Sequence, residues 1–122
     1  MRFDFQKLEV YQKGLDFVVV ADEIIGGLPK GRAYLADQLR RAAASIALNV
    51  AEGAGEFSPN EKARFYRIAR RSATESAGLL DILQRLALTT QEVVDDGQEQ
   101  LVQVVRMLTS LCRKLERRGT GQ

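Results

Sequence analysis

Residues 101–115, with the sequence LVQVVRMLTSLCRKL, place apolar side chains at alternating intervals of three and four residues. These positions are Leu101, Val104, Val105, Leu108, Leu111, Cys112 and Leu115. Such spacing puts them on one side of an α-helix, and it is typical of helices that cross at shallow angles. The segment therefore predicts a long amphipathic helix that belongs to a helical bundle.

Turn signals on either side of this segment divide the rest of the chain into helices. Glycine and proline at 26–31 end a first helix, and Gly53 and Gly55 end a second. Ser58-Pro59 with Glu61 predicts a capping box that opens a third helix, and Thr89 with Glu92 predicts another that opens the fourth. The predicted helices span 7–26, 32–54, 59–88 and 91–118. With no period-two segment to suggest a strand, we expect one all-α domain over residues 1–122, an antiparallel up-and-down four-helix bundle.

The composition is that of a globular protein that needs neither disulfide nor metal to fold. The chain has 122 residues, 45% of them hydrophobic and 28% charged, with a net charge of +2 and a single cysteine. No apolar run is long enough to span a membrane, and the N-terminus does not resemble a signal peptide. We therefore expect a cytoplasmic protein without a membrane partner.

The first two helices carry more apolar surface than one bundle requires. The first helix has one stripe at Leu8, Tyr11, Leu15, Val18, Val19 and Ile25, and a displaced second stripe at Val10, Gly14, Phe17, Ala21 and Ile24. In the second helix, residues 42–51 carry no charge, and Leu48 points away from the main stripe. We assign Val10, Phe17, Ala21, Ile24 and Leu48 to an interface with other copies of the chain, because extensive apolar patches are uncommon on monomers. The alternative is a skewed bundle in which these helices lie more centrally.

The absence of histidine limits the chemistry that the chain can perform. Without histidine there is no Ser-His-Asp or Cys-His catalysis and no Glu-x-x-His di-iron site, and one cysteine cannot supply a zinc site. We expect no catalytic residue, no metal and no cofactor, and hence no enzyme. Ser45, Asn49 and Glu52 form a polar ladder on the second helix. A structural role in packing specificity is favoured for them over catalysis.

A row of arginines on the third helix is the strongest candidate for ligand binding. Arg64, Arg67, Arg70 and Arg71 cluster there, and guanidinium groups bind phosphates. The row could follow a nucleic-acid backbone, or it could be a solvated face that pairs with neighbouring acids. A second basic cluster at Arg113, Lys114, Arg117 and Arg118 could serve the same purpose.

Several stretches carry a family resemblance that covers nearly the whole chain. They are residues 8–13 (LEVYQK), 38–46 (QLRRAAASI), 49–53 (NVAEG) and 65–72 (FYRIARRS). The sequence resembles bacterial four-helix bundle proteins encoded by intervening sequences within large-subunit ribosomal RNA genes. That resemblance extends to the accessory variability protein of diversity-generating retroelements. It implies a homo-oligomer, with five copies expected, and a basic surface that engages nucleic acid and a partner protein.

Two functions therefore compete. The leading hypothesis is a non-enzymatic, homo-oligomeric scaffold that binds RNA or DNA through the basic outer surface of the third helix. The alternative is a homo-oligomeric scaffold that binds only proteins. The two differ in whether the basic residues form one continuous surface.

Overall fold

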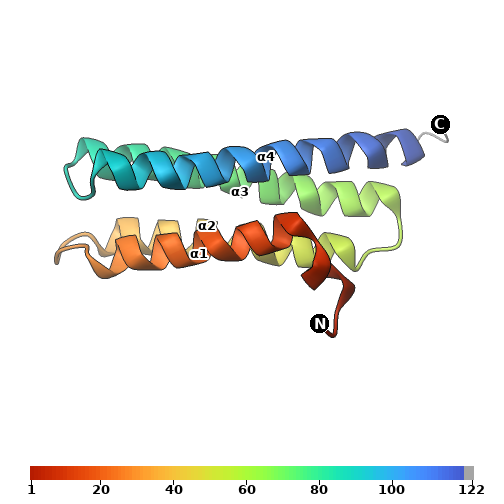
Figure 1. Ribbon diagram of the computed structural model, residues 1–122, viewed down its shortest axis with the longest axis horizontal. Helices are drawn as coiled ribbons and strands as arrows, with labels where there is room; N and C mark the ends of the chain where they lie inside the picture. The colour runs from red at the N-terminus through yellow and green to blue at the C-terminus, as the bar shows by residue number, and fades with distance from the viewer. Residues whose placement is uncertain (120–122) are drawn as a thin grey trace.

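The computed structural model describes residues 1–119 and contains four long helices in this range (Figure 1). A short 3-10 helix, η1 (Asp4–Lys7), leads into α1 (Glu9–Gly26), which is followed by α2 (Ala33–Ala54), α3 (Pro59–Arg85) and α4 (Gln91–Gly119). No strand occurs among the described residues. The prediction of an all-α fold is confirmed, and η1 is an element that helical periodicity did not predict.

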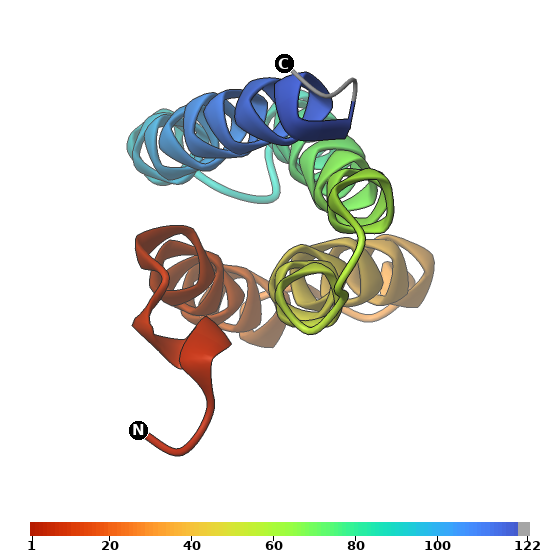
Figure 2. The same ribbon diagram turned by 90° about the vertical axis from the view of Figure 1, so that its right-hand side faces the viewer.

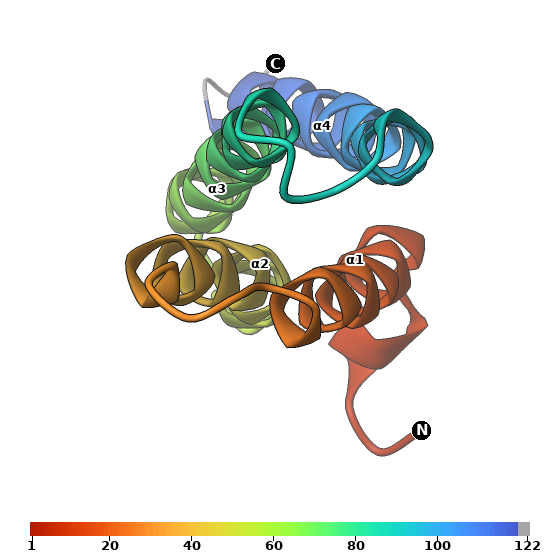
Figure 3. The same ribbon diagram turned by 90° about the vertical axis from the view of Figure 1, so that its left-hand side faces the viewer.

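The helices run alternately in opposite directions and form two layers (Figures 1, 2 and 3). One layer holds α1 and α2, and the other holds α3 and α4 (Figure 3). Each helix packs on the next in the chain, and α4 also contacts α1. Consecutive helices joined by short loops give this up-and-down arrangement, as the sequence predicted.

The core side of α1 is centred on the second predicted stripe, and Leu8, Tyr11, Val18 and Ile25 of the first stripe pack at its edge. Val10, Phe17, Ala21 and Ile24 are buried within the single chain, and the Phe17 side chain is 0% exposed. Leu15 and Val19, from the stripe predicted to face the core, are instead exposed. The assignment of Val10, Phe17, Ala21 and Ile24 to an interface between copies is therefore wrong. Leu48, the fifth member of that set, is exposed as predicted.

Small residues explain why the second stripe of α1 became the core side. A Cβ atom built on Gly14 would lie 3.3 Å from Ile46 Cγ2 and 3.5 Å from the Cα of Ala47, so glycine lets α1 approach α2 closely. Phe17 then fills the centre of the bundle between the small residues Gly14 and Ala21. Interlocking large and small side chains is how helical cores reach dense packing.

The helix ends follow the predicted signals with two shifts of position. The Ser58 hydroxyl accepts the Glu61 N–H at 3.3 Å, with Pro59 in the first helical turn. The cap of α4 is Thr90 rather than Thr89, because the Thr90 hydroxyl accepts the Val93 N–H at 3.2 Å. Helix α3 ends at Arg85 instead of residue 88, since Ala87 adopts the left-handed conformation at φ 59°. That turn is closed by the Leu88 N–H donating to the Leu83 carbonyl at 2.9 Å.

Candidate functional site

Three large aliphatic side chains of α1 and α2 are exposed, among charged neighbours such as Asp16 and Asp37. Val19 is 58% exposed, Leu48 is 61% exposed and Leu15 is 37% exposed. Leu15 and Val19 are one helical turn apart on α1, and Leu48 follows Ala47, which packs against Gly14 beside Leu15. Leu15, Val19 and Leu48 are called the apolar face below.

The four predicted arginines of α3 differ in their surroundings. Arg64 pairs with Glu61 at 2.9 Å, and its guanidinium lies 4.5 Å from the ring centre of Phe65. Arg67 pairs with Glu116 of α4 at 3.6 Å. Arg70 is half-buried and donates to the Thr109 hydroxyl of α4 at 3.3 Å. Arg67 and Arg70 thus link α3 to α4 through their side chains, in addition to contributing positive charge.

Arg71 differs from the other three members of the row, which each bond to a neighbouring side chain. It is exposed, and within residues 1–119 it forms no ion pair with Glu52, the partner that the sequence suggested. Helical spacing places Arg64, Arg67 and Arg71 on the same side of α3, facing away from the core. Arg71 is therefore available to a ligand without the loss of an intramolecular bond.

Helix α4 extends the basic surface beyond the predicted row. Arg106, Arg113 and Arg117 are exposed and spaced by seven and four residues, so they share one side of the helix. With Lys114 they line an open groove of about 330 Å³ along α4. Arg67 and Arg70 reach Glu116 and Thr109 of α4, and Thr109 lines the same groove as Arg106 and Arg113. Arg67, Arg70, Arg71, Arg106 and Arg113 are called the basic surface below. The sequence indicated Arg113, Lys114, Arg117 and Arg118 as a second basic cluster, whereas Arg106 was not predicted, although its spacing of seven residues from Arg113 was a usable signal.

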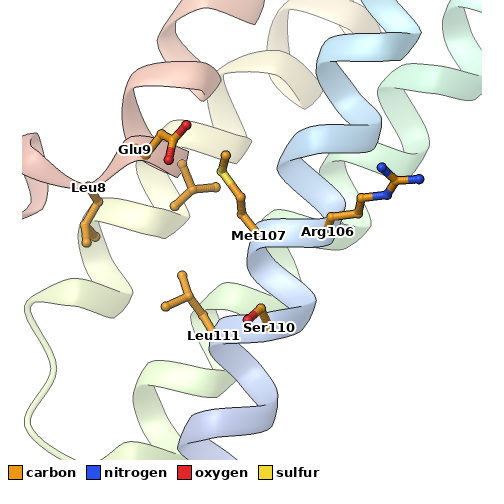
Figure 4. A pocket seen from close by; sticks show the side chains of 7 residues that line it. Leu8, Glu9, Arg106, Met107, Ser110 and Leu111 are labelled. Carbon is orange, nitrogen blue, oxygen red and sulfur yellow. The ribbon is translucent and has the colours of Figure 1, made fainter.

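Another groove lies on the other side of α4, against the start of α1. It measures about 400 Å³ and is mainly apolar, lined by Leu8, Val10, Met107 and Leu111, with Glu9, Arg106 and Ser110 at its edges. Figure 4 shows the Met107 side chain directed toward α1, whereas the Arg106 side chain extends away from Leu8 and Glu9. The guanidinium of Arg106 is thus oriented away from this groove.

The polar ladder of α2 is a local hydrogen-bond network. The Asn49 amide donates to the Ser45 carbonyl at 2.8 Å and to the Ser45 hydroxyl at 2.9 Å, both within α2. The link between helices is made by the Ser72 hydroxyl of α3, which donates to the Ser45 hydroxyl at 2.8 Å. Glu52 is exposed and has no hydrogen bond to this network among the described residues. Ser45 and Asn49 therefore belong to one network, and the ladder does not extend to Glu52.

The one cysteine is buried beside a tyrosine. The Cys112 thiol donates to the Ala63 carbonyl at 3.9 Å, and burial raises its pKa. Burial also raises the pKa of Tyr66, and the nearby Cys112 adds to this effect. Both groups are thus held neutral, which disfavours a thiolate nucleophile.

Metal clusters and membrane-spanning helices are both absent from the described residues. No group of three or more histidine, cysteine, aspartate or glutamate side chains is placed to hold a metal ion. None of the helices described in residues 1–119 has the length and hydrophobicity that crossing a membrane requires.

The fold and its two contrasting faces define a small all-α bundle protein with an apolar face on one layer and a basic surface on the other. Residues 6–110 match the family model of the 23S rRNA-intervening sequence proteins. The chain therefore belongs to that family, as the resemblance in its sequence indicated. No curated protein matches the chain.

A crystal structure from Bacteroides thetaiotaomicron has the same fold. It is described as a protein of unknown function from the S23 ribosomal protein family, and it matches with a TM-score of 0.78 at 23% sequence identity. The match covers 84% of this chain and 97% of that one. At this identity the similarity shows the fold alone.

Proposed function

We propose that this protein is a non-enzymatic, homo-oligomeric scaffold that binds the phosphate backbone of RNA or DNA. The observation that carries the proposal is the separation of two surfaces on opposite layers of the bundle. The apolar face lies on α1 and α2, and the basic surface lies on α3 and α4. Copies that associate through the apolar face would leave their basic surfaces accessible.

Self-association supports the binding role because it multiplies a modest charge. A net charge of +2 is weak for one chain, but a ring of copies repeats the basic surface at fixed intervals. Five copies is the stoichiometry expected from the family resemblance. Sedimentation velocity at micromolar concentration measures that number.

Phosphate contacts by the basic surface predict a steep dependence of affinity on salt. If four arginines per chain each contact one phosphate, the slope of log K against log salt is about −2.8 for a single strand and about −3.6 for a duplex. Affinity then falls roughly 50- to 150-fold between 50 and 200 mM salt. Because these contacts do not read bases, unrelated sequences should bind with similar affinity.

The test of phosphate binding reverses the charge at two exposed positions whose side chains do not link α3 to α4. Arg71→Glu with Arg113→Glu should weaken binding at least tenfold and reduce the salt slope by about two. Arg67 and Arg70 are poorer targets, since both contact α4. The matched control is Lys30→Glu with Arg85→Glu, which alters the net charge equally near the opposite end of the bundle.

Fluorescence anisotropy with labelled oligonucleotides distinguishes the outcomes. The proposal fails if the wild type shows no binding at low salt, or if both double variants weaken binding equally. Failure to bind at low salt would favour the alternative of a scaffold that binds only proteins.

A further inference from the structure

A groove on the outer side of the α3–α4 layer adjoins the basic surface. It measures about 440 Å³ and is mainly apolar. Its lining comes from Ala73, Thr74 and Ala77 of α3 and from Gln98, Leu101, Val102, Val105 and Arg106 of α4. The groove exists because the α3 residues are small, and it leaves Val102 47% exposed.

The apolar groove is continuous with the basic groove along α4. Val105 and Arg106 line both, and Arg113 lies farther along the basic one. Arg70 reaches the same region from α3 through its bond to Thr109, which also lines the basic groove. The apolar groove therefore opens beside several guanidinium groups. Along α4, Val102 and Arg106 are separated by one helical turn, a rise of about 6 Å.

We propose that this groove receives an unpaired base, so that the nucleic acid bound is single-stranded. The inference rests on the proposed function and narrows its ligand class. A nucleotide combines an aromatic body with an adjacent phosphate, which matches an apolar slot beside Arg106 and Arg113. In a duplex each base is stacked between its neighbours and cannot enter such a slot without flipping out.

The polar groups around the groove predict little sequence preference. The Gln98 amide N–H donates to the Ala77 carbonyl at 3.0 Å and to the Asp81 carboxylate at 2.8 Å. The Thr74 hydroxyl donates to the Arg70 carbonyl at 3.2 Å. Because these donors are already occupied within the protein, the base contributes mainly by burying its apolar surface.

The decisive probes are three oligonucleotides of equal length: a single strand, the same strand with internal abasic sites, and a duplex. The abasic strand keeps the phosphates and lacks the bases. Wild-type protein should bind the intact strand about five- to tenfold more tightly than the abasic strand, the gain expected from burying roughly 40 to 55 Å² of apolar surface in the groove. Equal binding of the intact and abasic strands would overturn the inference.

Two variants test the groove itself. Ala77→Leu fills the groove, and Val102→Glu places a carboxylate on its wall. Because Val102 is exposed, the Val102→Glu variant should still fold. Each should abolish the preference for the intact strand, with Ala77→Leu leaving duplex and abasic binding unchanged. The matched control is Gly78→Leu, which adds the same side chain one residue away, outside the groove lining, where a Cβ atom would meet nothing within 4 Å.

The outcomes separate this inference from the proposed function. If the intact and abasic strands and the duplex all bind, but the groove variants keep the wild-type preference, the groove assignment is wrong and phosphate binding stands. If no oligonucleotide binds at low salt, the proposed function fails and the inference fails with it.

Discussion

Gly53, in the last turn of α2, has no room for a side chain, so Gly53→Ala should destabilise the fold. A Cβ atom there would lie 2.8 and 2.9 Å from two ring carbons of Tyr66 and 3.1 Å from Phe65 Cβ. The Tyr66 ring is buried and cannot turn away freely. Overpacking of this kind costs about 1–3 kcal/mol, and the upper end applies to a rigid ring. Subtracting the gain of about 1 kcal/mol in helix propensity leaves a loss of about 2 kcal/mol.

Urea unfolding followed by far-UV circular dichroism measures this loss, with Gly78→Ala as the matched control. Gly78 lies within α3, and a Cβ atom there meets nothing within 4 Å. Gly78→Ala should therefore raise the free energy of unfolding by about 1 kcal/mol, opposite in sign to Gly53→Ala. For a chain of this size the two variants should shift the melting temperature by about −8 and +4 °C. The reasoning is refuted if Gly53→Ala is as stable as the wild type or more so.

Three more predictions follow from the core and the helix ends. Leu48→Glu should dissociate the oligomer and leave the helix content intact, whereas Phe17→Glu should unfold the chain because it buries a charge. Light scattering measures the first effect and circular dichroism the second, and a wild-type monomer at micromolar concentration would contradict the prediction for Leu48→Glu. Ala87→Gly should raise the free energy of unfolding by about 1 kcal/mol, because glycine adopts φ 59° without strain; an unchanged urea midpoint would contradict this. Because burial raises the pKa values of Cys112 and Tyr66, the folded chain holds these protons more tightly than the unfolded chain does. The free energy of unfolding should therefore fall as the pH rises above 9.0, the ordinary pKa of a thiol. Urea titrations of the wild type and of the double variant Cys112→Ala with Tyr66→Phe measure this loss, which should be smaller in the variant.

The helices were predictable because their turn signals are local. Ser58 and Pro59 mark the start of α3 through side-chain and backbone geometry that needs no tertiary contact. The end of α3 was misplaced because Leu86 and Leu88 continue the apolar pattern, while the chain turns at Ala87 in a conformation that alanine rarely adopts. η1 was missed because four residues are too few to show a helical period.

Which side of α1 faces the core could not be decided by periodicity. Both stripes have helical spacing and similar apolar character, so the pattern of α1 does not rank one above the other. The packing depends on the close approach of Gly14 to Ile46 and Ala47 of α2, a contact between helices that the pattern of α1 alone does not reveal. The arginine row was found from its composition, whereas its continuation onto α4 depends on contacts between helices, such as Arg70 with Thr109.

The up-and-down connection of the helices also has a consequence for how the chain folds. Because each helix packs on the next in sequence, most contacts close short loops, and only the α1–α4 contact joins the two ends of the chain. Topologies dominated by local contacts fold in microseconds to milliseconds. We therefore expect α2, α3 and α4 to associate first and α1 to dock against α4 last. During synthesis, the bundle can then be completed only after α4 has left the ribosome.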